Sequence, residues 1–335
     1  MTAAIIEHIS FLGEPAVKVT TEKLEGIVVP GWGSNLISLT WRPTGTALLR
    51  TPVSAEAYHA RTTLHGMPVL FPPSRIEGGA FTFRGREYRF PIADPARGYH
   101  IHGVLMRTAW RLSAAETAED GSAWVETTVV SEETPAVFEA LPHRFTVRQG
   151  FQFTADAVEL RFRLESRDEA AMPWGLGYHT TFVLPLTGPD GDLAACSLRL
   201  RADKTWALDE KLLPTGELID NPYRDAMAAG LPLDRVELDD VFFASPDAPF
   251  EATLEDRGAG LSIRYEGDRT FTQWVLYNGK GKPDRGFFCP EPLTWVPNAP
   301  NVDAPAELTG LQALEPGAAA EAVTRLTISA LSRLK

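Results

Sequence analysis

The sequence predicts an all-β protein built from antiparallel strands, and three observations support that prediction. A spacing of two residues between side chains on one face runs through most of the stretch from residue 110 to 167. Glycine turn signals separate such segments, and stretches with helical spacing are short and few. We find no internal repeat and no linker in the 335 residues, so we expect one domain over residues 1–335.

The N-terminal part predicts short strands and then one helix. Residues 4–12 and 16–20 are runs of apolar and β-branched residues, and residues 26–43 continue this pattern with turns between strands. Residues 52–60 are the first segment typical of a helix, and Ser54 is placed to cap its N-terminus.

Hairpins are predicted where the alternation changes phase. Phe81 and Phe83 lie on one side of Arg84-Gly85-Arg86, with Tyr88 and Phe90 on the other. We expect strand throughout residues 110–167, with a turn at 154–157, and a further hairpin over 252–266. Short helices are predicted at 221–229, before Gly230, and at 306–314.

The composition limits the kinds of molecule that this chain is expected to bind. The chain has 44% hydrophobic and 23% charged residues, which allows a sizeable core. The net charge of −12 opposes binding to nucleic acid or to anionic membranes, whereas a small neutral ligand would be indifferent to it. Cys196 and Cys289 are too few for a cysteine-rich zinc site, and we expect both to be reduced thiols.

No stretch of the sequence indicates export or membrane insertion. Residues 1–15 lack a basic start and a sustained apolar segment, so they do not resemble a signal peptide. No run approaches the roughly 18 apolar residues of a membrane span. We therefore expect a cytoplasmic protein.

Residues 65–110 carry the first two candidate site residues. Arg75 lies between Pro72-Pro73 and Gly78-Gly79, which predicts a loop that presents its guanidinium outside the core. His102 follows an alternating strand end and precedes Gly103, a residue type that permits close approach of a backbone or ligand.

Two further candidates stand in turn-rich settings. His179 lies in GLGYHTTF and is expected to enter a strand, where it is either a site residue or a packed histidine near a turn. Glu291 has Pro290 and Pro292 as neighbours, so its carboxylate is held in direction, beside Trp295, whose ring offers a flat stacking surface for a ligand. The plain alternative is an exposed glutamate in a proline-rich loop.

The ordered set of motifs resembles the aldose 1-epimerase (galactose mutarotase) family. These are GMPVLFPPSRIEGG, HG, Trp110, MPWGLGYHTTF, LDDVF and CPEPLTWVPNAPN, and they span nearly the whole chain. The resemblance implies a large, twisted β-sandwich with the sugar cleft on one sheet face. It also implies an isomerase that interconverts the α and β anomers of a hexose without a cofactor.

The resemblance assigns roles to individual residues. His179 matches the general acid, Glu291 the general base, and His102 a second catalytic histidine near the ring oxygen and the anomeric centre. Arg75 and Asp239 match substrate-binding positions. Asp240 adjoins Asp239, and a shift of one residue in the match would exchange them.

We expect Glu291 to be ionised and His179 to be readily protonated at pH 7, with no unusual tuning of either pKa. His100 and His102 are spaced so that both side chains lie on one side of a strand, which is an arrangement that can bind a metal ion. Such a site would need a carboxylate a few residues later, and the following sequence GVLMRTAW has none. We therefore expect neither metal nor cofactor, and a small-molecule sugar as the ligand of a monomer or homodimer.

The sequence leaves alternatives open for both the substrate and the reaction. Arg107 resembles an arginine of hexose-6-phosphate epimerases, but the sequence favours a solvated arginine at a strand end, and with it the free sugar. A glycoside hydrolase would pair Glu291 with Asp239. A non-catalytic sugar-binding or sensing protein on the same fold is the alternative from another class.

Overall fold

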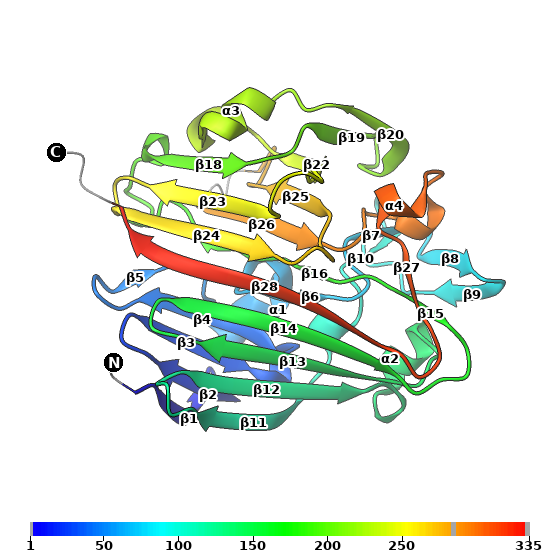
Figure 1. Cartoon of the computed structure of the whole chain (residues 1–335), viewed down its shortest axis with the longest axis horizontal. Helices are drawn as coiled ribbons and strands as arrows, with labels where there is room; N and C mark the ends of the chain where they lie inside the picture. The colour runs from blue at the N-terminus through cyan, green and yellow to red at the C-terminus, as the bar shows by residue number, and fades with distance from the viewer. Residues whose placement is uncertain (1–2, 283–285, 332–335) are drawn as a thin grey trace.

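The computed structural model describes residues 3–282 and 286–331, and a nine-stranded sheet forms its front in Figure 1. The sheet is ordered β11-β12-β13-β14-β28-β24-β23-β18-β21. Its strands are β11 (Arg111–Thr117), β12 (Ala123–Val130), β13 (Phe145–Phe153), β14 (Ala157–Ser166), β28 (Ala319–Ala330), β24 (Leu261–Gly267), β23 (Glu251–Asp256), β18 (Cys196–Leu200) and β21 (Leu231–Pro232).

An eight-stranded sheet lies behind it and carries most of the candidate site. Its order is β20-β19-β22-β25-β26-β16-β6, and β17 also pairs with β26. The strands are β20 (Pro214–Asp220), β19 (Lys204–Leu208), β22 (Asp239–Phe243), β25 (Gln273–Tyr277), β26 (Phe287–Leu293), β16 (Gly177–Tyr178), β6 (Val69–Leu70) and β17 (Phe182–Val183).

The remaining strands form smaller sheets. A five-stranded sheet follows chain order through β1 (Ile5–Phe11), β2 (Glu14–Thr20), β3 (Leu24–Val29), β4 (Asn35–Trp41) and β5 (Thr46–Ala47). Three two-stranded pairs join β7 (Arg75–Glu77) to β10 (Tyr99–Ile101), β8 (Ala80–Phe83) to β9 (Arg86–Arg89), and β15 (Met172–Trp174) to β27 (Gln312–Leu314). The helices are α1 (Ala55–Ala60), α2 (Pro135–Ala140), α3 (Arg224–Ala229) and α4 (Ala306–Thr309).

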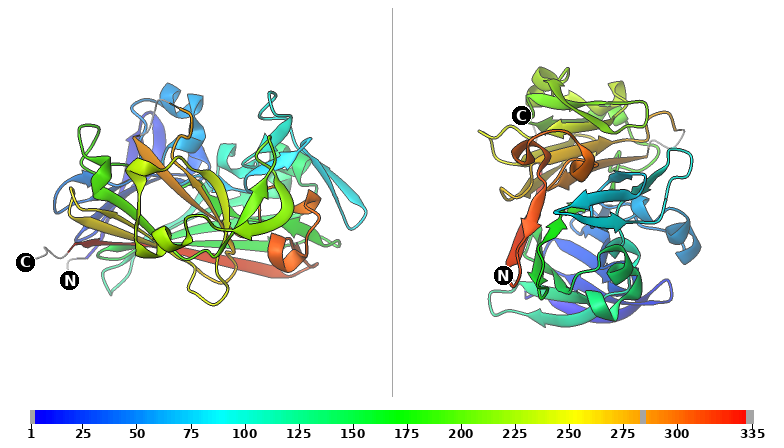
Figure 2. Two further views of the ribbon diagram at one scale, coloured as in Figure 1. Left: turned by 90° about the horizontal axis from the view of Figure 1, so that it is seen from above. Right: turned by 90° about the vertical axis from the view of Figure 1, so that its right-hand side faces the viewer.

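Aromatic side chains fill the space between the two large sheets. The Trp274 ring of β25 is stacked on Phe250 at 4.3 Å between centroids and meets Tyr265 of β24 edge-on. Tyr178 of β16 reaches the other sheet and donates its hydroxyl to Gln149 Oε1 of β13 at 2.8 Å. The two sheets therefore pack face to face, and the predicted all-β, antiparallel sandwich is confirmed (Figure 2).

The predicted helix ends and hairpin turns are confirmed where a capping or turn residue marks them in the sequence. Ser54 caps α1 and accepts a hydrogen bond from the Ala57 amide at 3.2 Å. The β8–β9 hairpin turns at Arg84-Gly85, and the β13–β14 turn occupies residues 154–156. Gly230 ends α3 with φ of 112°, although the helix begins at Arg224 and not at residue 221.

Two predictions about helices were wrong. Residues 110–167 are not all strand, because α2 interrupts them, and its Pro135 occupies the first helical turn, where no amide hydrogen is needed. The helix at 306–314 stops after one turn, because Gly310 takes the left-handed conformation at φ of 73°. Its last three residues instead pair with β15 as strand β27.

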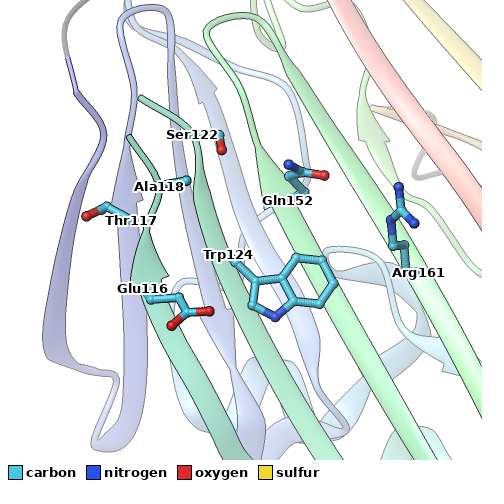
Figure 3. A pocket seen from close by; sticks show the side chains of 7 residues that line it. All are labelled: Glu116, Thr117, Ala118, Ser122, Trp124, Gln152 and Arg161. Carbon is cyan, nitrogen blue, oxygen red and sulfur yellow. The ribbon is translucent and has the colours of Figure 1, made fainter. Parts of the chain in front are cut away.

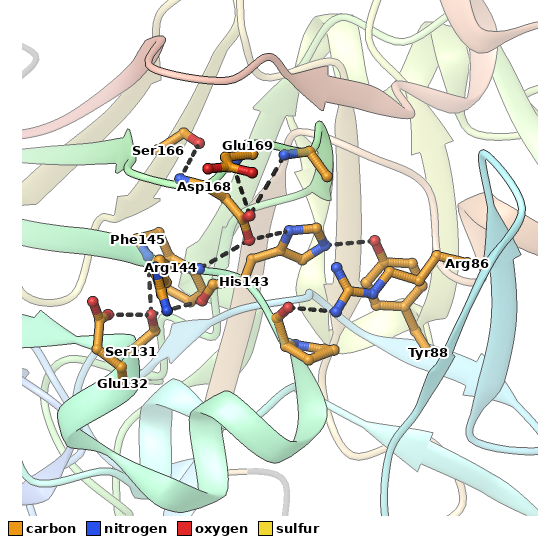
Figure 4. Close-up of polar contacts among 12 residues, drawn as sticks. Arg86, Tyr88, Ser131, Glu132, His143, Arg144, Phe145, Ser166, Asp168 and Glu169 are labelled. Atoms are coloured by element: carbon orange, nitrogen blue, oxygen red, sulfur yellow. Dashed lines mark hydrogen bonds and ion pairs between the residues drawn. The ribbon is translucent and has the colours of Figure 1, made fainter.

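A buried polar chain anchors the β8–β9 hairpin to the large sheet (Figure 4). The His143 ring contacts Asp168 Oδ2 through Nδ1 at 2.9 Å and the Tyr88 hydroxyl through Nε2 at 2.7 Å. Burial lowers the pKa of His143 and hydrogen bonds lower that of Asp168, so a neutral ring donates from Nδ1 to the carboxylate. Its Nε2 then accepts a hydrogen bond from the Tyr88 hydroxyl.

Candidate active site

A cavity of about 410 Å³ collects all five site residues that the sequence predicts. They come from positions far apart in the chain and from five different strands or strand ends. Within the cavity lining lie Arg75, His102, His179, Asp239 and Glu291. The sequence motifs that appeared separate are therefore one site.

Strand alternation explains how the eight-stranded sheet presents its carboxylates. In the register of the sheet, Glu291 of β26 lies opposite Val275 of β25, and Asp239 of β22 lies opposite Tyr277. All four line the cavity, whereas Trp274, one residue along, points into the core between the sheets. The expected alternative of an exposed loop for Glu291 is wrong, because β26 runs between β25 and β17.

Glu291 and His179 form a direct contact between a carboxyl group and an imidazole in the cavity. Glu291 Oε1 lies 3.2 Å from His179 Nε2, and the two residues are 2% and 4% exposed. Among the described residues Glu291 Oε2 has no hydrogen-bond partner. One carboxyl oxygen is thus engaged with the histidine, and the other is free to meet a ligand.

The ordinary pKa values expected from sequence are wrong for this pair. Burial lowers the pKa of His179 to about 4. Burial, with a smaller contribution from nearby Asp239, raises the pKa of Glu291 well above its usual range. Burial removes the water that would solvate the charged forms, so the neutral form of each group is favoured.

Arg75 is buried and not presented from a loop. It begins β7, is 7% exposed, and forms an ion pair with Asp239 Oδ1 at 3.0 Å. Its Nη1 donates to the Leu212 carbonyl at 3.2 Å. The neighbouring Asp240 lies 3.8 Å from Lys280 Nζ and does not line the cavity, so Asp239 is the acid that faces the site.

His102 does not share a strand face with His100. Its φ is 68°, in the left-handed region, and this turns its ring toward His179, with ring centroids 5.1 Å apart. His100 stays in β10, packs on Phe90 and hydrogen-bonds the Pro91 carbonyl at 2.7 Å. The spacing argument for a paired metal site therefore fails, and residues 3–282 and 286–331 contain no group of three or more metal-ligating side chains.

Trp295 cannot act as a sugar-stacking surface. It is 1% exposed, donates from its indole to the Pro73 carbonyl at 3.2 Å, and covers Gly175 so closely that a Cβ there would lie 2.3 Å from the ring. Its role is to pack the segment that leads to Arg75 against β26.

The sequence reasoning missed Asn298, which positions Arg75. Asn298 adopts φ of 64° and donates its amide to the Arg75 carbonyl at 2.7 Å. Its side-chain oxygen accepts from the Glu77 amide at 3.0 Å, so it holds both ends of β7. The Pro-Asn-Ala turn of the last motif was the available signal, since asparagine tolerates the left-handed conformation.

A second hollow elsewhere contains no comparable chemistry. It encloses about 440 Å³ on the outer face of the nine-stranded sheet, around Trp124, Glu116 and Arg161 (Figure 3). It has one carboxylate and no histidine among its lining side chains. We therefore place the candidate site in the cavity of Glu291 and His179.

Comparison with known proteins gives one consistent result. The family model described as Aldose 1-epimerase matches residues 15–327. The uncharacterised Escherichia coli protein YihR is 25% identical over 278 residues, which are 80% of each chain.

Solved structures of low sequence identity share the fold. A galactose mutarotase-like protein of Clostridium acetobutylicum has a TM-score of 0.90 at 24% identity, over 98% of this chain and 99% of its own. A galactose 1-epimerase of Lactobacillus acidophilus has a TM-score of 0.74 at 15% identity, over 99% and 100%. Throughout the described part of the chain, every helix is too short or too polar to span a bilayer.

Proposed function

The chain belongs to the aldose 1-epimerase family, and from that premise we propose that it interconverts the α and β anomers of a hexose. The observation that carries the proposal is the contact of Glu291 with His179 at 3.2 Å in a cavity lined mainly by polar side chains. Mutarotation needs one proton acceptor and one proton donor within reach of the same sugar ring. This pair supplies both.

The reaction conserves the protons of the pair. The base takes the proton of the C1 hydroxyl, the bond from C1 to the ring oxygen breaks to give an aldehyde, and the acid protonates the ring oxygen. Rotation about the C1–C2 bond followed by the reverse steps gives the other anomer. We assign Glu291 as base and His179 as acid, as in the family motif.

Burial makes this assignment depend on a shared proton. When the pair holds one proton, the arrangement with Glu291 protonated and the arrangement with His179 protonated differ only by transfer along the 3.2 Å contact. The Arg75 charge lowers the pKa of Glu291 against the larger effect of burial, and so favours the carboxylate. A bound sugar hydroxyl would add a hydrogen bond to the same form.

The other three residues fit roles in binding. Arg75 and Asp239 neutralise each other at 3.0 Å and offer fixed polar atoms to sugar hydroxyls, since Arg75 Nε has no partner in the described residues. His102 is kept neutral, because burial and the nearby positive groups hold its pKa well below the usual range. A neutral imidazole can donate a hydrogen bond to the ring oxygen without adding charge.

The direct test is anomer exchange, followed by NMR on freshly dissolved glucose and galactose. Glu291→Gln keeps the shape but cannot accept the proton, so kcat should fall by about 10² to 10⁴ while binding persists. Glu139→Gln is the matched control, because Glu139 is exposed in α2 and remote from the cavity lining. A strong chelator should leave the rate unchanged.

The rival functions give different results in the same assay. A sugar-binding protein would shift sugar resonances without speeding exchange. A hydrolase would release a sugar from a glycoside and would depend equally on Asp239 and Glu291. Near wild-type exchange by Glu291→Gln would remove the carboxylate from the mechanism.

A further inference from the structure

A buried threonine contacts the ring nitrogen of His179 that Glu291 leaves free. The segment between β16 and β17 carries His179, Thr180 and Thr181, and both threonines are fully buried. Glu291 Oε1 lies against Nε2 of the imidazole at 3.2 Å. The other ring nitrogen, Nδ1, lies 3.4 Å from the Thr181 hydroxyl oxygen. Thr181 does not line the cavity, so its hydroxyl acts on the site through His179 and not through a ligand.

The neighbours of the Thr181 hydroxyl decide which partner donates a proton. Two of them are backbone carbonyls, of Thr63 at 3.2 Å and of His179 at 3.4 Å, and a carbonyl oxygen can only accept. The single hydroxyl proton is therefore directed at the carbonyls. The lone pairs of the oxygen then face Nδ1 of His179 and the Cys289 sulfur, each at 3.4 Å. All of these contacts are satisfied together only when Nδ1 carries a proton.

A second contact of the His179 ring also requires a proton on Nδ1. A hydrogen bond to its own backbone raises the pKa of His179 against the larger effect of burial. The group that raises the pKa in this way is the carbonyl, which accepts from a ring N–H. Nδ1 is the ring nitrogen nearer to the backbone, whereas Nε2 is turned to Glu291. Two acceptors, the Thr181 hydroxyl and the carbonyl, thus fix one tautomer of the imidazole.

This tautomer determines where the proton of the acid–base pair lies. Burial lowers the pKa of His179 to about 4, so the ring is neutral at pH 7, and its Nε2 then has a lone pair. That lone pair faces Glu291 Oε1 at 3.2 Å, and two acceptors cannot share a hydrogen bond. The carboxyl must supply the proton. The raised pKa of Glu291, which burial causes, agrees with a protonated carboxyl.

We propose that Thr181 is a positioning residue that fixes the Nδ1–H tautomer of His179, so that in the unliganded protein the shared proton rests on Glu291 Oε1. Its part in turnover rests on the epimerase function proposed above. Transfer of this proton breaks the O–H bond of Glu291 and forms the Nε2–H bond of His179, which gives the carboxylate and the imidazolium together. The carboxylate then takes the C1 hydroxyl proton, and Nε2 returns its proton to the ring oxygen. The opposite tautomer cannot start this sequence, because its Nε2 already carries a proton.

Side-chain ¹⁵N NMR of the unliganded protein at pH 7 tests the tautomer directly. A protonated ring nitrogen and one with a lone pair differ widely in ¹⁵N shift, and loss of signals in His179→Gln identifies His179 among the seven histidines. We expect Nδ1–H in the wild type and in Thr181→Ser, which keeps the hydroxyl. Thr181→Val should move part of the population to Nε2–H. An Nε2–H ring in the wild type, or the same tautomer in Thr181→Val, would overturn the proposal.

Anomer exchange tests the consequence of the tautomer for turnover. Thr181→Val should lower kcat by at least about tenfold, as with other hydrogen-bond partners that orient a functional histidine. Its KM should stay within about twofold, because Thr181 touches no ligand. Thr181→Ser should restore kcat. Thr181→Ala removes the same hydroxyl without the bulk of valine and gives the same comparison if Thr181→Val does not fold.

Thr180→Val is the matched control for the loss of a buried hydroxyl. Thr180 is the adjacent residue and equally buried, but its hydroxyl bonds the Tyr265 hydroxyl of β24 at 2.9 Å, in the core between the sheets. The His179 tautomer and kcat should both match wild type in this variant. Equal losses of kcat in Thr180→Val and Thr181→Val would show a general packing effect and contradict the assignment to Thr181.

The NMR measurement separates this inference from the function on which its role rests. If no sugar is epimerised but the ring is Nδ1–H and changes tautomer in Thr181→Val, the epimerase function fails and the positioning by Thr181 stands. If sugars are epimerised and the tautomer is the same with and without the hydroxyl, only the present proposal fails.

Discussion

Burial decides the proton chemistry of Glu291 and His179 at the scale of single residues. Removing water favours the neutral form of each group, so the carboxyl and the imidazole move their pKa values in opposite directions. Their 3.2 Å contact then couples the two titrations. The working state is the pair with one proton, and the limits of activity are the pH values at which that proton is lost or a second one is added.

The pH dependence of kcat/KM should reflect that single proton. The second proton enters the pair on the acid side, where the pKa of His179 lies at about 4, so activity should persist through weakly acidic solution and fall near that pH. The alkaline limb reports loss of the proton from the pair, governed by the raised pKa of Glu291. Anomer exchange corrected for the uncatalysed rate gives the profile. An acid limb near pH 6.5 would show a solvated histidine instead.

We also expect Glu291 to lower the free energy of unfolding of the unliganded protein at neutral pH. Its pKa is higher in the folded than in the unfolded chain, so the folded state keeps a proton that the unfolded state releases as pH rises. Its stabilising contribution is complete only below the unfolded pKa, and stability then falls by up to about 1.4 kcal/mol per pH unit until the folded pKa is reached.

Glu291→Gln removes this titration. The variant should therefore gain thermal stability relative to wild type, and the gain should grow as the pH rises above the unfolded pKa of a glutamate. Thermal midpoints measured at each pH check this, with Glu139→Gln as the control, which should follow wild type throughout. A variant less stable than wild type by a constant amount would show that the carboxyl is mainly a packing group.

At the scale of elements, Gly103 allows the loop that carries His102 to pack closely against another part of the backbone. The sequence indicated a close approach at this position but not its partner. Gly103 follows His102 with φ of 69°, and a Cβ there would lie 2.1 Å from the Phe71 carbonyl oxygen. The loop after β10 therefore packs directly on the segment before Arg75. The dipeptide His-Gly signalled close approach of a backbone, but not which backbone.

Gly103→Ala should destabilise the protein by at least about 2 kcal/mol and reduce activity, because both the left-handed conformation and the contact with Phe71 oppose a side chain. Gly45→Ala is the matched control. Gly45 has the same φ of 69° with no atom within 4 Å of the added Cβ, so it measures the conformational cost alone. Urea unfolding gives both values. Equal losses in the two variants would mean that the Phe71 contact relaxes freely.

The elements also show why the sequence predicted which residues form the site better than it predicted their secondary structure and burial. Hydrophobic alternation and turn residues are local, so strands and hairpins were predictable. Burial is a property of the partner sheet, so the sequence placed Arg75 on a loop and left a loop open as the alternative for Glu291, although both belong to strands. Trp295 was expected at the sugar for the same reason, and it is instead covered on both sides.

At the scale of the whole molecule, the chain closes on itself through its last strand. β28 pairs with β14 on one side and β24 on the other, in the middle of the nine-stranded sheet, as the red strand of Figure 1 shows. No local pattern specifies that order, because the partners are separated by more than a hundred residues in one case. The order is set by pairing between strands that are distant in the sequence, and not by local spacing.

This closure should make the described chain unfold as one unit. Buried side chains from Ala4 to Ile328 form a continuous core, and β28 connects the halves of the sheet. Unfolding followed by tryptophan fluorescence and by far-UV circular dichroism should give coincident midpoints, since the eight tryptophans are spread along the sequence. Leu24→Ala, at a fully buried position in β3, should lower both midpoints together, because stability lost at one end is lost by the whole cooperative unit. Two separated transitions, with only one shifted by Leu24→Ala, would divide residues 1–335 into two domains and place the Glu291 cavity in whichever part unfolds with the loss of sugar binding.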